Sequence, residues 1–287
     1  MNKSFKITQN PENSNWKLSK TLDDQELDIC FKVYSWQEFI LKQNQQSATM
    51  QFFPYFSSTE TSKLVNPDVK ELSQNNFLAY VESEFIRLER QPAICLNLNH
   101  PEYSLQVRFL SEKGYSPLPE KDTFMIYRGN SKNRDLKSEA QISITDCNSA
   151  AQKDVFIDVF NEAFFDGRTN VTEAYELIVR KSFEPNPDYK VENFIYPSVE
   201  FPDKMVACSS LLTDINGASK IYNVGTLPEF RRQGLAFKML EKVIEHWLSF
   251  DQKDYLSIHT VADSSPERLY TKLGFERVCL QETWVKG

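Results

Sequence analysis

Glycine is scarce in this chain and unevenly distributed. The 287 residues include eight glycines, and none of them precedes Gly114. A backbone that closely approaches a bulky phosphate often needs glycine, because a side chain at the contact would block the approach. The part of the chain before Gly114 therefore cannot build a glycine-containing phosphate loop, and such a loop is expected only in the second half.

Metal ligands and paired thiols are also few. The three histidines and five cysteines are scattered without the spacing of a metal site, so we expect no metal ion. The cysteines are odd in number and form no Cys-x-x-Cys pair, which predicts reduced, buried thiols rather than disulfides. They are Cys30, Cys95, Cys147, Cys208 and Cys279.

Basic charge and long apolar runs are lacking as well. The chain has 33 Lys and Arg against 40 Asp and Glu, a net charge of −7. Nonspecific nucleic-acid binding needs a basic surface, so no nucleic-acid partner is expected, whereas a cationic substrate is compatible with this charge. The first 20 residues lack the apolar segment of a signal peptide, and no run of about 18 apolar residues could span a membrane. We therefore predict no membrane partner and a cytoplasmic location.

The chain divides at a polar segment. Residues 128–141, RGNSKNRDLKSEAQ, contain almost no apolar side chains, which is typical of an interdomain linker. The sequence thus predicts one domain over 1–130, a linker over 131–141 and a second domain over 142–287, each domain of ordinary size.

The second half alternates strand and helix patterns. Apolar residues recur at helical spacing over 235–248, and Asn148 or Ser149 is placed to cap an earlier helix that extends to 164. The predicted order of strand, two helices, three strands, helix, strand, helix and strand indicates a mixed α/β layered domain. The strands are expected over 142–145, 193–201, 205–212, 220–227, 255–261 and 277–285, and the other helices over 171–183 and 266–273.

One helix start carries a candidate phosphate site, in the stretch FRRQGLAFKMLEKV. The N–H groups at a helix N-terminus lack partners and attract anions. Gly234 and Ala236 keep side chains out of the contact, while Arg231 and Arg232 add positive charge. The alternative is an ordinary helix start with an exposed basic pair.

The surroundings of this helix start resemble the GNAT superfamily of acyl-CoA-dependent N-acyltransferases. Residues 231–236, RRQGLA, match its Q/R-x-x-G-x-G/A motif, the strand VGTLPEF precedes them, and LYTKLGF follows at 269–275. The resemblance covers roughly 140–287. It implies a mixed, mostly antiparallel twisted sheet flanked by helices.

The resemblance also implies where a coenzyme A thioester, expected to be acetyl-CoA, would bind. The motif would hold the pyrophosphate, the preceding strand would pair with the pantetheine arm, and the strand over 255–261 would splay away. The residues implied for the pyrophosphate are Arg231, Arg232, Gln233, Gly234, Leu235 and Ala236, and those for pantetheine are Val224, Gly225, Thr226 and Leu227.

Two catalytic positions follow from the resemblance. Tyr270 matches the family tyrosine that protonates the departing thiolate, although an aromatic side chain packed in the core is the alternative. Family members often place a carboxylate on the strand before the phosphate loop, but SKIYNVGT carries none. Glu200 is our first candidate for the base, because we expect it in a strand beside the cleft, and Asp214 and His259 are the others. Asp263 also departs from the family, which often has an asparagine there.

The implied activity is transfer of an acetyl group to a primary amine by direct attack in a ternary complex. The acceptor would be a small molecule or a peptide amine. Two other hypotheses stay open: a non-catalytic acyl-CoA-binding protein, and a binding module that docks an acidic partner through the basic helix start.

An internal repeat extends the resemblance to the first half. Residues 108–129 and 268–287 share a short helix, a glycine followed by an aromatic residue, and then a strand, with another strand before each. We therefore predict two tandem GNAT-like domains, of which the first is a degenerate copy without a phosphate loop.

Overall fold

The computed structural model describes most of the second half of the chain and less of the first. The described residues are 3–9, 16–20, 49–52, 63–65, 72–73, 77–87, 91–128, 145–146, 149–165, 180, 182–183, 189–198, 200–214, 217–251 and 255–287. The predicted linker 131–141, most of the helix predicted over 171–183, Cys30 and Cys147 lie outside these residues. Contacts divide the chain into two compact units, with boundaries after Phe124 and after Arg277.

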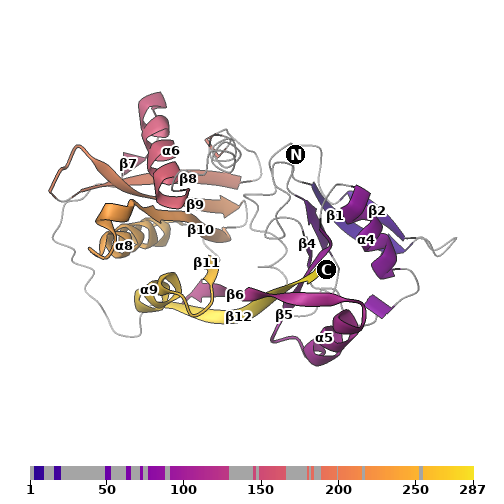
Figure 1. Cartoon of the computed structure of the whole chain (residues 1–287). Coiled ribbons are helices and arrows are strands. Elements are labelled where there is room, and N and C mark those ends of the chain that lie inside the picture. The colour runs from indigo at the N-terminus through magenta and orange to yellow at the C-terminus, as the bar shows by residue number, and fades with distance from the viewer. Residues whose placement is uncertain are drawn as a thin grey trace. The chain divides into compact units, whose positions relative to one another are not determined.

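The first unit contains the described residues up to Phe124 together with Val278–Gly287. Its strands follow the order β2-β1-β3-β4-β5-β12-β6, and Figure 1 labels all of them except β3. Helix α4 and strand β5 supply much of its core, in which Phe85, Ile94 and Trp284 are buried. The elements are β1 (Lys3–Gln9), β2 (Trp16–Lys20), β3 (Thr49–Phe52), β4 (Lys63–Val65), α4 (Phe77–Arg87), β5 (Ala93–Asn97), α5 (Tyr103–Glu112) and β6 (Tyr115–Tyr127).

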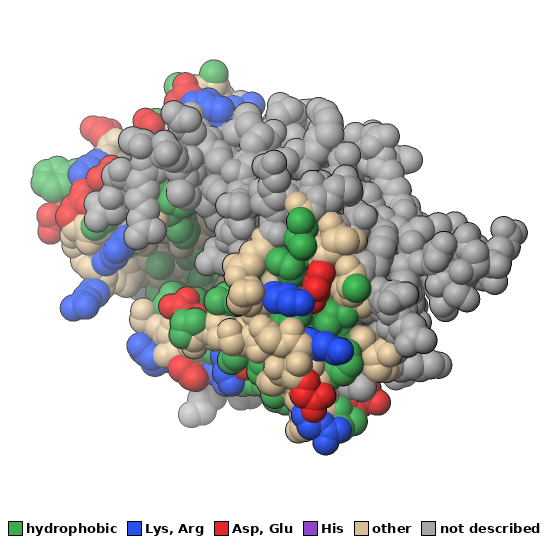
Figure 2. All heavy atoms as spheres, turned by 45° about the vertical axis from the view of Figure 1, so that its right-hand side comes forward, with side chains coloured by type: hydrophobic (Ala, Val, Ile, Leu, Met, Phe, Trp, Pro, Cys, Tyr) green, Lys and Arg blue, Asp and Glu red, His purple; other side chains and the backbone are tan. Residues whose placement is uncertain are grey.

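Charges of both signs lie side by side on this part of the surface. Figure 2 shows basic and acidic side chains of described residues next to one another. Within the first unit, Lys286 Nζ lies 2.7 Å from Glu82 Oε1, and Lys121 Nζ lies 3.4 Å from Glu282 Oε2. These pairs neutralise each other locally.

The second unit, Met125–Arg277, has a mostly antiparallel sheet in which β6 is followed by β11-β10-β9-β8-β7. Its described elements overlap the predicted ones and α8 has the predicted bounds, but β8 begins and ends four residues earlier than the strand predicted over 193–201. They are β7 (Thr145–Asp146), α6 (Ala150–Phe164), β8 (Tyr189–Pro197), β9 (Met205–Asp214), β10 (Ser219–Thr226), the 3-10 turn η1 (Pro228–Phe230), α8 (Leu235–Leu248), β11 (Leu256–Val261), α9 (Ser265–Leu273) and β12 (Phe275–Lys286).

Helices cover both faces of the sheet of the second unit. Adjacent residues of a strand point to opposite faces. Ile195 of β8 packs in a core cluster with Phe156 of α6, whereas its neighbour Phe194 packs in another cluster with Val243 of α8. Helix α6 begins at the predicted cap, where the Ser149 hydroxyl accepts a hydrogen bond from the Gln152 N–H. This arrangement confirms the predicted mixed α/β layers for this unit.

The repeated segments share their local structure. Helix α5 is followed by Gly114 at φ 82° and the strand β6, and α9 is followed by Gly274 at φ 102° and the strand β12. Strand β12 pairs antiparallel with β5 in the first unit, which contains β12 from Val278 onward, and only Met125–Tyr127 of β6 belong to the second unit. The domain boundaries predicted from the sequence follow chain order, whereas the first unit also contains Val278–Gly287 from the end of the chain. The tandem arrangement of two GNAT-like domains stays a prediction.

The described cysteines agree with the expectation of reduced thiols. Cys95, Cys208 and Cys279 are buried, and none of these three forms a disulfide bond in the described part of the chain. Burial raises the pKa of the Cys279 thiol to about 12, which keeps it protonated and unreactive at neutral pH.

Candidate functional site

The central feature of the second unit is the separation of two parallel strands. β10 pairs with β11 only through Ser219, Lys220 and Ile221, opposite residues 256–258. Both strands continue, β10 to Thr226 and β11 to Val261. Among the described residues, the edge of β10 from Tyr222 to Thr226 therefore has no strand partner on the β11 side. This is the divergence that the sequence led us to expect, and it leaves backbone groups open to an extended ligand.

A bulge shapes the same part of β10. Its register against β9 shifts between Tyr222 and Gly225, and Asn223 adopts a left-handed φ of 54°. Asparagine tolerates this conformation better than most residues because its short polar side chain can form local hydrogen bonds. The bulge turns the backbone between the last residue paired with β11 and the segment Val224 to Leu227.

Gly225 allows helix α6 to approach this strand closely. A Cβ atom at Gly225 would lie 2.8 Å from Phe164 Cε2, 2.9 Å from Ala163 Cβ and 3.2 Å from Cys208 Sγ. No side chain fits in this space without moving the helix. Gly225 is thus required by packing on the α6 face, while its other backbone edge faces the diverging strand.

The loop before α8 contains two residues with a left-handed backbone. Gly234 caps α8 at φ 77°, and Arg232 is also left-handed at φ 64°. The first hydrogen bond of the helix runs from the Lys238 N–H to the Gly234 carbonyl, at 3.1 Å. The N–H groups of residues 235–237 therefore have no acceptor within the helix. A Cβ at Gly234 would meet nothing within 4 Å, so the position that a side chain of this residue would take is open.

The side chain of Arg231 is bonded to two backbone carbonyl groups of the same unit, and its predicted part in cofactor binding stays a prediction. Its Nε donates to the Thr226 carbonyl at 3.1 Å, and its Nη2 donates to the Ala163 carbonyl at 2.9 Å. The guanidinium group therefore joins the end of β10 to the end of α6 and holds the loop in place. Arg232 and Gln233 are exposed beside it, and the Gln233 amide donates to the Glu229 carbonyl.

Glu200 does not lie in a strand, contrary to the sequence prediction. β8 ends at Pro197, and Glu200 is an exposed residue of the turn before β9. Its N–H donates to the Ser198 hydroxyl, and Lys204 of the same turn forms an ion pair with Glu229 at 3.1 Å. The early end of the strand follows from Pro197 and Pro202, since proline cannot donate to a strand ladder.

The other two candidate bases lie at different ends of the sheet. Asp214 is the last residue of β9, at the end of the ladder where Thr213 pairs with Ser219. His259 is an exposed residue of β11 and directly follows Ile258, the last residue of β11 that pairs with β10. Of the three candidates, His259 is the one placed where the strands separate.

Tyr270 is both a core residue and a phenol held in its protonated form. It is 5% exposed and packs edge-on against Phe275 with ring centroids 6.3 Å apart. Burial raises the pKa of its hydroxyl well above the ordinary value of 10. The packing role and the proton-donor role predicted for this residue are therefore compatible.

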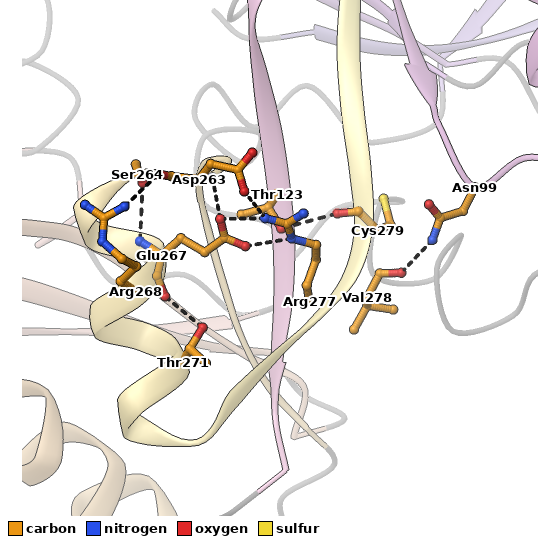
Figure 3. A network of polar contacts seen from close by, with 10 residues as sticks. All are labelled: Asn99, Thr123, Asp263, Ser264, Glu267, Arg268, Thr271, Arg277, Val278 and Cys279. Carbon is orange, nitrogen blue, oxygen red and sulfur yellow. Dashed lines mark hydrogen bonds and ion pairs between the residues drawn. The ribbon is translucent and has the colours of Figure 1, made fainter.

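Asp263 is engaged by an arginine that sequence reasoning missed. Its backbone is left-handed at φ 59°, and Arg277 Nη2 donates to its carboxylate at 2.8 Å. Arg277 also donates from Nε and Nη2 to the buried carboxylate of Glu267, and these side chains meet at the start of α9 in Figure 3. Arg277 lowers the pKa of Glu267 through these bonds. The charge of Asp263 is thus compensated, which explains how an acid can replace the asparagine common in the family.

Comparisons with known proteins agree with this geometry. Residues 194–277 match the family model described as acetyltransferase (GNAT) domain. Residues 194–277 form a GNAT acetyltransferase domain. The matched range runs from β8 to the start of β12, so the GNAT domain contains the bulge, the diverging strands, the loop before α8 and helix α9. The comparison with curated protein sequences finds no match.

Solved structures share the fold of a larger part of the chain. A GCN5-related N-acetyltransferase from Kribbella flavida has a TM-score of 0.59 at 15% identity, covering 88% of this chain and 92% of its own. A functionally unknown conserved protein from Staphylococcus epidermidis has a TM-score of 0.60 at 10% identity, covering 83% and 90%. A tandem GNAT protein from the clavulanic acid biosynthesis pathway has a TM-score of 0.56 at 10% identity, covering 83% and 78%. At these identities the likeness concerns the fold.

Two further observations concern the described residues alone. Among the described residues, no group of three or more His, Cys, Asp and Glu side chains is arranged to hold a metal ion. Within the same residues, no helix has the length and apolar character needed to cross a membrane.

Proposed function

We propose that this protein is an N-acetyltransferase that moves the acetyl group of acetyl-CoA to a primary amine. The observation that carries the proposal is the separation of β10 from β11 after Ile221 and Ile258, which leads directly to an open helix start at Gly234. An extended thioester needs both features, an unpaired strand edge for its amide-containing arm and N–H donors for its phosphates. The GNAT domain supports an acyltransferase activity, and the acetyl donor and amine acceptor are our proposal.

The residues present fit acetyl-CoA as the donor substrate. The N–H groups of residues 235–237 would face the pyrophosphate, and Gly234 leaves the backbone accessible there. The exposed Arg232 adds positive charge, whereas Arg231 contributes by fixing the loop. The segment Val224 to Leu227 would pair with the pantetheine arm, and one of its N–H groups would polarise the thioester carbonyl.

The reaction needs one proton donor and one proton acceptor. As the amine nitrogen bonds to the acyl carbon, the carbon–sulfur bond breaks and the sulfur takes a proton from Tyr270. The attacking amine loses a proton to water or to a nearby base, and that release allows Tyr270 to recover its proton. A phenol with a raised pKa stays protonated at neutral pH, so the donor form is available before each turnover.

The first test separates binding from turnover. Titration calorimetry with acetyl-CoA should show saturable binding, and thiol release should then be followed with tyramine, spermidine, kanamycin and a lysine-containing peptide. Release that depends on one of these amines supports the proposal. Binding without amine-dependent release would favour the non-catalytic acyl-CoA-binding alternative, and no binding at millimolar acetyl-CoA would contradict both.

Replacing Tyr270 tests the proton donor. Tyr270→Phe should lower kcat by about 10²- to 10⁴-fold, the usual contribution of a positioned acid, and leave the Kd of acetyl-CoA nearly unchanged. Tyr127→Phe is the matched control, because Tyr127 is also in the second unit and packs edge-on against Phe275, at 5.4 Å. A large loss of acetyl-CoA affinity in Tyr270→Phe would assign the residue to binding instead.

A further inference from the structure

A chain of hydrogen bonds runs through the interior of the GNAT domain and ends at the bulge of β10. Asn223 Nδ2 donates to Ser210 Oγ at 3.2 Å, and Ser210 Oγ donates to Asn193 Oδ1 at 2.6 Å. Asn193 Nδ2 in turn donates to Ser182 Oγ at 3.1 Å. Ser210, Asn193 and Ser182 are 0%, 2% and 3% exposed, so three buried polar residues hold one half-buried amide.

The direction of these bonds determines which atom of Asn223 is left available. The Ser210 hydroxyl donates its one hydrogen to Asn193, so toward Asn223 it can only act as an acceptor. The N–H₂ group of Asn223 is therefore bonded to the buried Ser210, and its Oδ1 is the side-chain atom left to accept a hydrogen bond. Oδ1 accepts no hydrogen bond from any residue that the structure describes. It is not one of the fully buried side-chain atoms that lack a hydrogen-bond partner.

The position of this oxygen connects it with the proposed reaction. Asn223 directly precedes Val224, the first residue of the segment that would pair with the pantetheine arm, and its backbone is left-handed. The Asn223 carbonyl oxygen lies 3.5 Å from Cys208 Sγ, and Cys208 is paired with Gly225. The amide therefore belongs to the stretch of β10 beside which the thioester would lie.

We infer that Asn223 binds the acceptor amine, its Oδ1 accepting a hydrogen bond from the amine nitrogen, and that Ser210, Asn193 and Ser182 position it. This inference rests on the proposed N-acetyltransferase function and names the acceptor-binding group of that same site. It also names the acceptor's reactive form. An uncharged amide oxygen accepts from a neutral amine without adding the strong stabilisation of the ammonium form that a carboxylate would provide.

The test is a comparison of acceptor binding with donor binding in three variants. Asn223→Gly keeps the left-handed backbone and removes the amide. We expect the KM of the amine to rise about tenfold, which corresponds to the loss of one hydrogen bond. Ser210→Ala leaves Asn223 in place but releases its anchor, and a smaller rise in the same KM is expected. The Kd of acetyl-CoA should stay within about twofold of wild type in both variants.

Ser209→Ala is the matched control. Ser209 adjoins Ser210 on β9 but points to the other face, it is 0% exposed, and its hydroxyl has no hydrogen-bond partner among the described residues. This variant should leave both constants unchanged. The amine used is whichever of tyramine, spermidine, kanamycin and the lysine peptide gives the fastest thiol release with the wild-type protein.

The outcomes separate this inference from the function on which it rests. An unchanged KM of the amine in Asn223→Gly, with an active wild type, overturns the role of Asn223 and leaves the N-acetyltransferase activity standing. A rise in the Kd of acetyl-CoA without a rise in the KM of the amine also overturns it, because Asn223 would then serve the donor. If the wild-type protein binds acetyl-CoA but acetylates none of the amines, both proposals fail.

Discussion

Gly234 and Gly114 offer a matched test of the phosphate loop. They adopt nearly the same left-handed backbone, at φ 77° and 82°, and a Cβ at either position would meet nothing within 4 Å. Alanine at such a position is strained by about 1–2 kcal/mol, partly offset by the roughly 0.5–1 kcal/mol gained from a less flexible unfolded chain. Gly234→Ala and Gly114→Ala should therefore each lower the free energy of unfolding by about 1 kcal/mol or less.

Their effects on ligand binding should differ sharply. Gly234 caps α8 beside the N–H groups that would face the pyrophosphate, whereas Gly114 lies between α5 and β6 of the first unit. A methyl group at Gly234 stands where the ligand approaches the backbone, so the Kd of acetyl-CoA should rise at least about tenfold, equivalent to 1.4 kcal/mol. Gly234→Glu adds bulk and negative charge and should abolish binding, while Gly114→Glu should not.

Urea unfolding measures the stability of each variant, and calorimetry with acetyl-CoA measures its affinity. Equal affinity in Gly234→Ala, Gly114→Ala and the wild type would refute the reasoning, because the open space at Gly234 would then not be a ligand site. Equal loss of affinity in both alanine variants would also refute it, since the loss would follow from stability alone.

Two further changes test the packing and the charge network of the GNAT domain. Gly225→Ala places a methyl group against Phe164 and Ala163, so it should destabilise the protein by about 1–3 kcal/mol in urea unfolding, and Phe164→Leu in the same chain should recover part of this loss. Arg277 lowers the pKa of Glu267 in the folded state. The pair therefore contributes its full stabilisation above the carboxyl pKa of the unfolded chain, about 4.3. That contribution is lost as the pH falls through the lower pKa that Glu267 has in the folded state. Glu267→Gln should therefore cost about 1.5–3 kcal/mol at pH 7 and progressively less below about pH 4, whereas the exposed Glu276→Gln should cost almost nothing at either pH. A cost of Glu267→Gln that does not change with pH would contradict the assignment of the ion pair.

Local patterns in the sequence predicted the elements that carry the proposed donor site. Helix α8 could be delimited because its apolar residues recur at helical spacing and Gly234 stands at its start. The separation of β10 from β11 followed from the family resemblance and agrees with the pairing. The bounds of α8 depend on residues close together in the chain, which is why one sequence suffices to find them, whereas the strand separation needed the family resemblance.

Features that depend on distant partners escaped prediction. The pairing of β12 with β5, which places Val278–Gly287 in the first unit, joins residues almost 200 positions apart and has no signal in the local pattern of either strand. Arg231 matched the loop motif, but its acceptors on Thr226 and Ala163 are known only once α6 lies against β10. An isolated asparagine in the run SKIYNVGT was the available signal for Asn223, and only the β9 register reveals its bond to Ser210.

The missing carboxylate on β10 has a chemical consequence that the structure makes specific. A carboxylate close to the acceptor would hold the amine as an ammonium ion and then need to remove its proton. The amide of Asn223 does not hold the amine as an ammonium ion in this way. The acceptor can therefore bind as the neutral amine, and its proton is removed only as the new bond to carbon forms. His259, at the residue where β11 leaves β10, has a side chain of the type that accepts protons near neutral pH, whereas Glu200 lies in a turn joined to the phosphate-loop side by Lys204 and Glu229. If the neutral amide of Asn223 binds the acceptor and the proton leaves later, we predict that the base is His259 on β11 rather than a residue of the strand that would hold the donor.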